Sequence, residues 1–227
     1  MKSNSHPLQS ALKRATDLAV AATVLLCASP MLACVAMLIW WKMGRPVLFR
    51  QVRPGRFGRP FTLYKFRTMS DARGPDGRLL PDAERFTPLG RFLRASSIDE
   101  LPQLWNVLRG EVSLVGPRPL LTEYLERYTP EQARRHDVRP GITGLAQVTG
   151  RNSLPFSKRL ELDVYYVDHG NLAMDLKILV LTLLKVVGRR LDDGAGQHVS
   201  VVDDLGLHPD TRALRAAAAA KVQEASR

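Results

Sequence analysis

An uninterrupted apolar run dominates the hydropathy pattern of the chain. It extends from Leu18 to Trp41, 24 residues without a charged side chain. At a rise of about 1.5 Å per residue, a helix of this length can cross a hydrocarbon core of about 30 Å. Trp40 and Trp41, at its end, are typical of the membrane–water interface. The pattern therefore predicts a membrane segment near the N-terminus.

The form of this segment depends on a Ser-Pro pair near its middle. Proline lacks the N–H that a helix needs, so Ser29-Pro30 indicates either one kinked transmembrane helix or a re-entrant pair of helices separated by a break. From the residues alone the two forms are equally favoured, although basic side chains flank both ends, as expected when both ends are cytoplasmic. A cleaved signal peptide is disfavoured, because the apolar run continues beyond Met31-Leu32-Ala33-Cys34, the sequence that resembles a processing site.

Shorter patterns predict the elements that follow. Alternating apolar and polar side chains in residues 61–67 predict a short strand or hairpin after Pro54-Gly55, and residues 71–82 are typical of a surface loop. A run from Leu176 to Val187 predicts a helix too short to span a membrane, which lies either at the membrane interface or in the core. The i, i+3, i+4, i+7 spacing predicts the apolar face of another helix at Leu101, Leu104, Trp105 and Leu108.

The charge balance narrows the classes of partner. The chain carries 33 Lys and Arg against 22 Asp and Glu, a net charge of +11, which favours nucleic acid, acidic lipid or phosphorylated small molecules. Aromatic residues make up 7% of the chain and do not alternate with basic ones, which disfavours base stacking on nucleic acid. Only two cysteines are present, so a disulfide-stapled scaffold is excluded, and Cys27 and Cys34 are expected to be small buried apolar side chains.

Two adjacent carboxylates at the start of the predicted helix are the strongest candidates for chemistry. Asp99 and Glu100 would lie at its positive end, a setting that binds phosphate and favours ionised carboxylates. Their ordinary role would be helix capping, with Ser97 and Glu100 at capping-box spacing or with Asp99 as the cap. Neighbouring helical side chains diverge by about 100°, so one carboxylate could face a phosphorus atom while the other held a hard cation.

Two stiff turns downstream carry one arginine each. Gly116-Pro117-Arg118-Pro119 presents Arg118, and Arg139-Pro140-Gly141-Ile142-Thr143-Gly144 presents Arg139, followed by Gln147, Arg151 and Asn152. A planar guanidinium matches the geometry of phosphate oxygens, so the two turns together predict a diphosphate clamp. A structural turn is the simpler explanation of either one alone.

Several motifs together resemble the bacterial sugar transferase family, the small monotopic phosphoglycosyl transferases. They span approximately residues 10–190 in matching order and spacing. The motifs are Lys13-Arg14 with Asp17, Ser29-Pro30, Lys65-Phe66-Arg67-Thr68-Met69, the block from Arg94 to Leu104 that contains Asp99-Glu100, and the two stiff turns. Larger members place transmembrane helices and a further domain before this block, whereas this chain resembles the members that consist of the catalytic domain.

The resemblance implies an activity and roles for individual residues. Members transfer sugar-1-phosphate from a UDP-sugar to polyprenyl (undecaprenyl) phosphate with Mg²⁺ and release UMP, which initiates a lipid-linked glycan. By this match Asp99 is the nucleophile that forms a phosphosugar-aspartyl intermediate, and Glu100 ligates Mg²⁺. The matched residues contact phosphates, so they do not specify the sugar. The residues expected to bind substrate are Lys65, Arg67, Arg94, Arg118, Arg139, Gln147, Arg151 and Asp163.

The resemblance also implies a fold and a location. We expect a mainly helical α+β protein in three parts: a re-entrant helix-break-helix anchor (1–44) with the break at Ser29-Pro30, a small interfacial catalytic domain with short strands (45–191), and an Ala-rich tail (192–227). The site would lie at the cytoplasmic face of the bacterial inner membrane, against inner-leaflet phospholipid and without nucleic acid, with a homodimer left open. The alternatives are a membrane-anchored basic binding module and, less favoured, a glycosidase, whose two carboxylates must flank a sugar.

Overall fold

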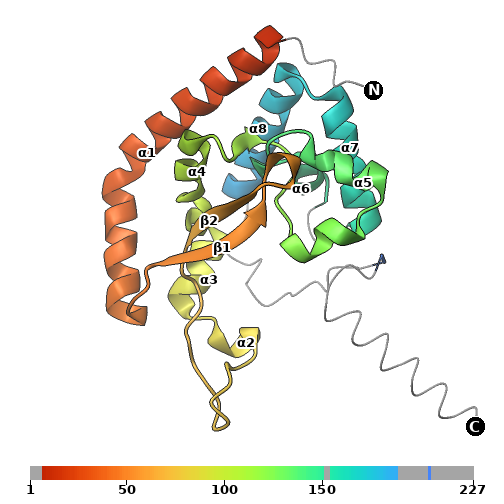
Figure 1. The fold of residues 1–227 in the computed structure, drawn as a ribbon. Helices are drawn as coiled ribbons and strands as arrows, with labels where there is room; N and C mark the ends of the chain where they lie inside the picture. The colour runs from red at the N-terminus through yellow and green to blue at the C-terminus, as the bar shows by residue number, and fades with distance from the viewer. Residues whose placement is uncertain (1–6, 151–153, 189–203, 206–227) are drawn as a thin grey trace, which may run out of the picture.

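The computed structural model describes residues 7–150, 154–188 and 204–205. Its first element is one long helix, α1 (Pro7–Met43), which runs along the side of a smaller domain and bends on the way (Figure 1). By length and composition α1 can cross a membrane, which agrees with the predicted membrane segment. Most of its apolar side chains are exposed, and Cys27 and Cys34 are exposed with them. The expectation that these cysteines are buried was wrong, because no other element of the described residues packs over them.

The predicted break at Ser29 and Pro30 is not seen as a gap between two helices. Pro30 lies inside the continuous helix, where it cannot donate to the Leu26 carbonyl one turn earlier. The Ser29 hydroxyl donates to that carbonyl instead, with Oγ at 2.7 Å from the oxygen. The carbonyl is thereby satisfied without water, as an apolar environment requires. The Ser-Pro pair therefore permits a bend while the helix continues.

The N-terminal turns of α1 are attached to the domain by three charged side chains. Arg14 Nη1 donates to the Val107 carbonyl at 2.8 Å, at the end of helix α4 (Gln103–Arg109). Asp17 is buried and accepts from Ser113 Oγ at 2.8 Å, on strand β3 (Ser113–Val115). Lys13 pairs with Asp175 of helix α8 (Leu172–Val187). The motif Lys13-Arg14-x-x-Asp17 thus fixes the membrane helix to three other elements.

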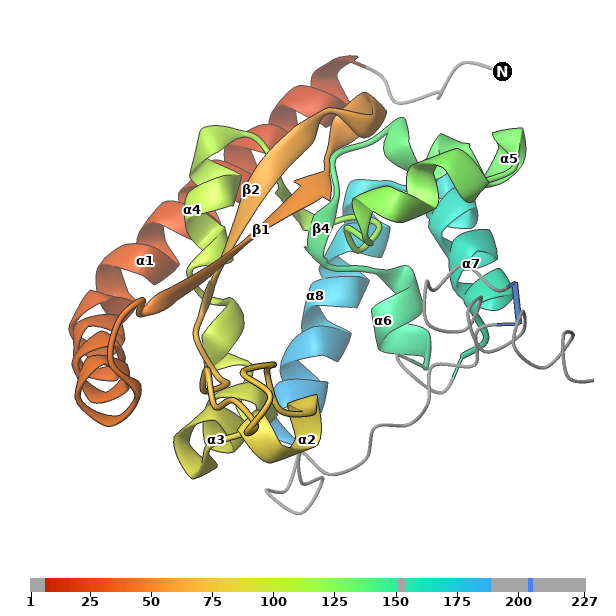
Figure 2. The ribbon, with the colours of Figure 1, turned by 60° about the horizontal axis from the view of Figure 1, so that its bottom comes forward.

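A hairpin follows α1, as the alternation predicted. Strand β1 (Leu48–Pro54) pairs antiparallel with β2 (Pro60–Phe66), and the 3-10 turn η1 (Arg56–Gly58) joins them. Phe61 and Leu63 are buried, and Figure 2 shows the hairpin lying over α4. Phe66 points the other way and is also buried, in a second cluster with Val35 and Ile39 of α1. The hairpin therefore lies between two packed layers.

A short parallel pair forms the centre of the domain. Strand β3 pairs with β4 (Gly141–Thr143), with Ser113 opposite Gly141 and Val115 opposite Thr143. A Cβ on Gly141 would lie 2.1 Å from the Gly116 nitrogen, so only glycine permits this approach. The main apolar core surrounds the pair, with contributions from α1, α4, the hairpin, α7 (Phe156–His169) and α8. The two stiff turns of the sequence thus lie side by side.

The remaining helices are short and lie around this centre (Figures 1 and 2). The predicted surface loop leads into α2 and α3, and 3-10 turns alternate with helices as far as α6. Together with the two small sheets they confirm a mainly helical α+β fold. These elements are α2 (Asp82–Arg85), α3 (Pro88–Ala95), η2 (Ile98–Glu100), η3 (Thr122–Arg127), α5 (Pro130–Ala133), η4 (Arg134–His136) and α6 (Leu145–Thr149).

Helix α4 begins later than its apolar spacing predicted. Asp99 and Glu100 lie in the preceding turn η2, and Ser97, at a left-handed φ of 59°, makes no side-chain cap hydrogen bond. The predicted capping box is therefore wrong. Leu104 is buried, whereas Trp105 is 53% exposed, because α4 packs with one narrow side against α1 and the hairpin.

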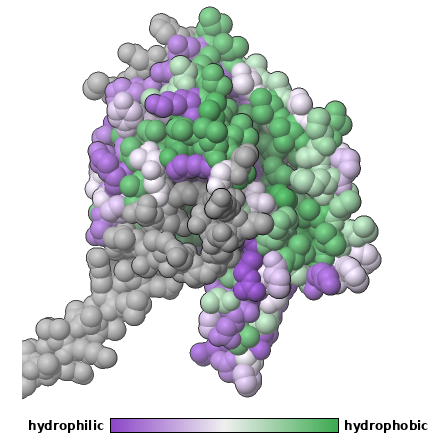
Figure 3. Space-filling view, turned by 180° about the vertical axis from the view of Figure 1, so that it is seen from behind, coloured by the Kyte–Doolittle hydropathy of each residue, from purple (hydrophilic) through white to green (hydrophobic). Residues whose placement is uncertain are grey.

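Helix α8 has one buried and one exposed apolar side. Asn171 caps its N-terminus by accepting from the Met174 N–H, so α8 is longer than the run that predicted it. Ile178 is fully buried, while Leu176, Leu183 and Leu184 are exposed. Seen from behind, a broad apolar surface follows α1 along the molecule (Figure 3). Almost all of the predicted C-terminal tail, 192–227, lies outside the described residues.

Candidate active site

The Asp99–Glu100 turn is held between two helices and faces the hairpin. Turn η2 separates α3 from α4, and Ser96 ends α3 by donating its hydroxyl to the Phe92 carbonyl at 2.8 Å. Ser97 follows in a left-handed conformation and leads into the turn. As a result, Asp99 is 7% exposed and Glu100 reaches two cations from distant segments.

Glu100 is held by a lysine of β2 and by the arginine of the first stiff turn. Lys65 Nζ lies 2.7 Å from Glu100 Oε1, and Arg118 Nη2 lies 2.6 Å from the same oxygen. Burial alone would raise the pKa of Glu100, but Arg118 and Lys65 outweigh it and hold the pKa well below its ordinary value. Glu100 is therefore ionised at every physiological pH.

Asp99 has the opposite electrostatic character. Burial and the adjacent Glu100 charge raise the pKa of Asp99 to about 6, against the opposing effect of Lys65, Arg94 and Arg118. Among the described residues, none donates a hydrogen bond to the Asp99 carboxylate. At neutral pH it is thus mainly ionised, more basic than an ordinary aspartate, and available for reaction. Two neighbouring carboxylates with separated pKa values are suited to different tasks.

Asp99 and Glu100 can hold a hard cation only if water and the phosphates of a substrate supply the other oxygen ligands. Glu100 Oε2 has a contact of 3.5 Å with Arg118 Nη1, so its lone pairs are largely available. In the described part of the chain, no group of three or more His, Cys, Asp or Glu side chains could enclose a metal. Mg²⁺ needs only one or two carboxylates and takes its other ligands from water and phosphates. The donor set therefore fits Mg²⁺ shared between Glu100 and a phosphorylated ligand.

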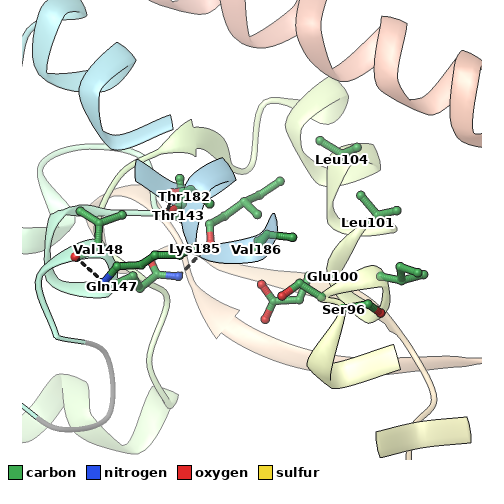
Figure 4. A pocket seen from close by; sticks show the side chains of 13 residues that line it. Ser96, Glu100, Leu101, Leu104, Thr143, Gln147, Val148, Thr182, Lys185 and Val186 are labelled. Carbon is green, nitrogen blue, oxygen red and sulfur yellow. Dashed lines mark hydrogen bonds between the residues drawn. The ribbon is translucent and has the colours of Figure 1, made fainter. Parts of the chain in front are cut away.

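A cavity of about 230 Å³ opens beside Glu100. Figure 4 shows Thr143, Gln147, Thr182 and Lys185 on one side of it, and Leu101 and Leu104 on the other. Gln147 donates through Nε2 to the Ile142 carbonyl at 3.0 Å, while its buried Oε1 has no hydrogen-bond partner among the described residues. Gln147 therefore presents an unused acceptor, as a predicted substrate-binding residue should.

Arg94 also lies near the turn. Its guanidinium stacks over Phe86, with Cζ at 4.6 Å from the ring centroid, and its charge lowers the pKa of Asp99. Lys65, Arg94, Arg118 and Gln147, four of the predicted substrate-binding residues, are thus assembled around Asp99 and Glu100. Arg151 lies outside the described residues.

Arg67 is not part of this site. It is buried and donates from Nη1 to the Met43 and Arg45 carbonyls at 3.2 and 3.1 Å. An ion pair of 2.7 Å with Asp71 completes its contacts. The Arg67 guanidinium is thus occupied by the carbonyls that end α1, and its contact with substrate stays a prediction.

Arg139 points away from the Asp99–Glu100 turn. Its Nε donates to the Gly110 carbonyl at 3.0 Å, and it lines a second cavity beside Lys13 and Asp17. Arg139 and Arg118 therefore lie at different cavities, and the diphosphate clamp formed by both stays a prediction. The turns are adjacent, but the parallel pairing of β3 and β4 sends their arginines to different partners.

Asp163 is buried and paired with an arginine that contacts the first stiff turn. It is buried on α7 and pairs with Arg135, whose Nη2 lies 2.6 Å from Asp163 Oδ2. The same Arg135 nitrogen donates to the Arg118 carbonyl at 2.7 Å. The pair thus contacts the turn that carries Arg118, and a substrate-binding role for Asp163 stays a prediction.

Sequence reasoning missed Arg135 and the residues that α8 contributes. Arg135 lies within Arg134-Arg135-His136, which resembles an exposed basic run and gives no local signal of burial. Thr182 and Lys185 follow the buried Ile178 at i+4 and i+7, on the same side of a mainly apolar helix. Polar residues in that register could have indicated a cavity.

Comparisons with known proteins agree with this arrangement. A model of the family "Bacterial sugar transferase" matches residues 8–189. A Bacillus subtilis protein named "Uncharacterized sugar transferase EpsL" is 57% identical over 176 residues, which cover 78% of this chain and 87% of that protein.

Two further relatives have more specific names. An "Undecaprenyl-phosphate galactose phosphotransferase" of Salmonella typhimurium is 40% identical over 204 residues, and the match covers 81% of this chain but 41% of that protein. A Caulobacter vibrioides "UDP-glucose:undecaprenyl-phosphate glucose-1-phosphate transferase" is 43% identical over 181 residues, covering 75% of this chain and 68% of that protein. The matched part of the Salmonella protein is thus less than half of its length.

Proposed function

The chain belongs to the bacterial sugar transferase family, and we propose that it transfers sugar-1-phosphate from a UDP-sugar to polyprenyl phosphate and releases UMP. Its product would be the first lipid-linked sugar of a capsule, exopolysaccharide, O-antigen or glycoprotein glycan. The names of two relatives specify galactose and glucose respectively, so membership of the family leaves the sugar open.

One observation carries this proposal: the buried Asp99 carboxylate, with its raised pKa, lies next to Glu100, which is paired with two basic side chains. Asp99 has a raised pKa and accepts no hydrogen bond among the described residues, whereas Glu100 is fixed by Lys65 and Arg118. A helix cap would have neither property, since capping carboxylates accept backbone hydrogen bonds. A buried carboxylate nucleophile surrounded by cations suits attack on a phosphate.

The reaction would proceed in two displacements at one phosphorus atom. An Asp99 carboxylate oxygen attacks the phosphorus that bears the sugar, the bond from that phosphorus to the bridging oxygen breaks, and UMP leaves with the electron pair. A phosphate oxygen of the acceptor then attacks the same phosphorus, and the bond to Asp99 breaks. The second step restores the carboxylate and leaves a sugar joined to the lipid through a diphosphate.

The surrounding residues would bind and orient the donor. Lys65, Arg94 and Arg118 carry the positive charge that the diphosphate requires, and Gln147 Oε1 can accept a hydrogen bond from a sugar hydroxyl. Arg151 is proposed as a further phosphate ligand on the family match alone. Mg²⁺, held by Glu100 and the diphosphate, would supply neutralisation of the phosphate charge that repels a carboxylate.

We further propose that α1 is re-entrant, with both ends at the cytoplasmic face of the inner membrane. Its N-terminal turns contact β3 and α4 through Asp17 and Arg14, and its C-terminal turns pack on Phe66 and Leu93 of the same domain. A helix that crossed the membrane would instead place its ends on opposite sides. This arrangement brings a soluble UDP-sugar and a membrane-bound acceptor to one site, next to inner-leaflet phospholipid.

The test is UMP release by detergent-solubilised protein from a panel of UDP-sugars, with Mg²⁺ and undecaprenyl phosphate, beside Asp99→Asn. We expect turnover with one donor and its loss in the variant, with unchanged folding and membrane insertion, because asparagine preserves the shape of the side chain. Normal turnover by folded Asp99→Asn would refute the nucleophile. No UMP from any donor would favour a membrane-anchored module that binds anionic lipid.

A further inference from the structure

The second cavity, of about 130 Å³, lies beside the N-terminal turns of α1. Its walls come from segments far apart in the chain: α1, the turn η1, strand β3, the second stiff turn and the junction of α7 with α8. Figure 1 shows this end of α1 close to α8. Among the described residues, none lines both this cavity and the one beside Glu100. A ligand here would therefore bind apart from the Asp99–Glu100 turn.

Two buried carboxylates line the cavity, but both already have donors. Asp17 accepts from Ser113 Oγ at 2.8 Å. Asp175 accepts from Lys13 Nζ at 2.6 Å and from the Tyr166 hydroxyl at 2.5 Å. A metal cation would have to displace the Lys13 ammonium to reach Asp175. The acidic groups therefore do not make this a cation site.

Two arginines that line the cavity have unused donors. Arg139 donates through Nε to the Gly110 carbonyl at 3.0 Å, and Arg56 donates through Nε to the Asp137 carbonyl at 2.9 Å. Arg56 also stacks over the Phe57 ring, which uses none of its N–H groups. Within the part of the chain that the structure describes, neither guanidinium makes a further hydrogen bond or an ion pair. Their terminal Nη groups can thus bind a ligand.

The remaining features of the cavity select the charge and the size of that ligand. Asn171 and Leu172, at the beginning of α8, line it as well, so the positive end of a 16-residue helix dipole adds to the two guanidinium charges. Guanidinium groups match the geometry of phosphate oxygens. A volume of about 130 Å³ holds a small ion with a few water molecules but is well below the roughly 300–1,000 Å³ of a site for a drug-sized molecule.

We propose that this cavity binds one phosphate-type oxyanion through the Nη groups of Arg56 and Arg139. Because Gln9 of α1 lines the same cavity, the bound anion links the N-terminal turns of the membrane helix to the rest of the domain. The site goes beyond the proposed transfer reaction and does not depend on it. Inorganic phosphate and the headgroup phosphate of an anionic phospholipid offer the same chemistry, so the experiment must distinguish these two sources.

The test is the midpoint of thermal unfolding of the full-length protein in neutral detergent. Inorganic phosphate is compared with chloride at equal ionic strength, which removes general screening. A second series adds phosphatidylglycerol to the micelles, with phosphatidylcholine as its control. Arg56→Gln and Arg139→Gln each remove one guanidinium. Arg59→Gln is the matched control, since Arg59 is exposed in the same hairpin turn and is not among the described lining residues.

Phosphate at about ten times its dissociation constant should raise the midpoint by about 3–6 °C in the wild type and in Arg59→Gln. We expect Arg56→Gln and Arg139→Gln to lose this rise. Each comparison is made within one variant, so a lower starting stability does not affect it. A rise with phosphatidylglycerol alone, lost in the same two variants, would support the site and assign it to a lipid headgroup.

Three outcomes would overturn the inference. The first is the absence of a rise with either phosphate source. The second is a rise that persists in Arg56→Gln and Arg139→Gln, which would place the anion elsewhere, such as at the Asp99–Glu100 turn. The third is an equal loss in Arg59→Gln, which would show that only the net charge of the hairpin matters.

Discussion

Lys13 Nζ lies 2.6 Å from Asp175 Oδ2, so an ion pair joins the membrane helix α1 to α8 across 162 residues of sequence. The same ammonium donates to the Val115 carbonyl at 3.1 Å, and the Tyr166 hydroxyl donates to the other Asp175 oxygen at 2.5 Å. The Asp175 carboxylate is buried, so its charge must be compensated at this point. These bonds set the position of α1 relative to the catalytic domain.

Lys13→Met should therefore destabilise the domain by leaving the buried Asp175 charge unpaired. Loss of one partner of a fully buried pair costs about 3–5 kcal/mol, and we expect about 2 kcal/mol here because Lys13 retains access to water. Denaturant unfolding in detergent measures the difference. Lys42→Met is the control, since Lys42 is an exposed lysine of the same helix.

A second variant separates this ion pair from a general effect on the helix. Lys13→Met with Asp175→Asn removes both charges, so it should recover part of the lost stability, while asparagine can still accept from Tyr166. Equal losses in Lys13→Met and Lys42→Met would show that Asp175 does not depend on its lysine.

Local patterns predicted most of the elements but not the partners of the arginines. The apolar run, the alternation of residues 61–67 and the helix after Leu176 each depend on neighbouring residues, and the structure confirms all three. Arg67 lies in a basic segment and Arg118 in a stiff turn, and the sequence gives both the same expected role. In the structure Arg67 binds the carbonyls that end α1, whereas Arg118 binds Glu100. The partner of each arginine depends on how α1 and η2 pack against β2, which local sequence does not reveal.

The capping prediction failed for a related reason. The carboxylate pair and Pro102 are typical of a helix start, and by local criteria the helix should begin there. Packing of η2 between α3 and β2 instead favours a separate 3-10 turn that buries Asp99. The departure from the local pattern thus occurs at the candidate site, where burial changes the chemistry of the side chain.

The two arginines should respond differently to the same substitution. Arg118→Gln removes a cation from Glu100 and from the proposed diphosphate site, so we expect a donor KM at least tenfold higher. Arg67→Gln leaves the Met43 and Arg45 carbonyls without their donor, so we expect lower thermal stability with an unchanged donor KM. Measurement of both quantities in both variants tests the assignment, and a raised donor KM in Arg67→Gln would contradict it.

Asp99 should titrate well above an ordinary aspartate in metal-free protein. Burial and the Glu100 charge raise its pKa to about 6, so protonation should remove the nucleophile as the pH falls through 6. Glu100→Gln removes the neighbouring negative charge and frees two cations, so it should lower the Asp99 pKa. NMR of ¹³C-labelled aspartate in the presence of EDTA measures both values. A pKa near 4 in the wild type would exclude this description of the turn.

Transfer should require a divalent cation and depend on Glu100 for its binding. EDTA should abolish UMP release, and Mg²⁺ should restore it. Glu100→Gln loses the ionised oxygen that would ligate the cation, so it should require at least tenfold more Mg²⁺ and be slower at saturation. Magnesium titrations of wild type and variant provide the comparison. If the two titrations coincide, Glu100 is not the ligand.

The orientation of α1 can be tested with single cysteines at its two ends. Cys27 and Cys34 are exposed within the apolar run of α1, so both can be replaced by alanine to give a cysteine-free protein. Leu8→Cys and Arg45→Cys then mark ends that are both solvent-accessible. A re-entrant helix places both thiols on the cytoplasmic side, so a membrane-impermeant maleimide should label both in inside-out vesicles and neither in intact cells. A transmembrane helix would give opposite labelling at the two positions. Because both ends of α1 pack on one domain, opposite labelling would also require that domain to separate from one end of the helix.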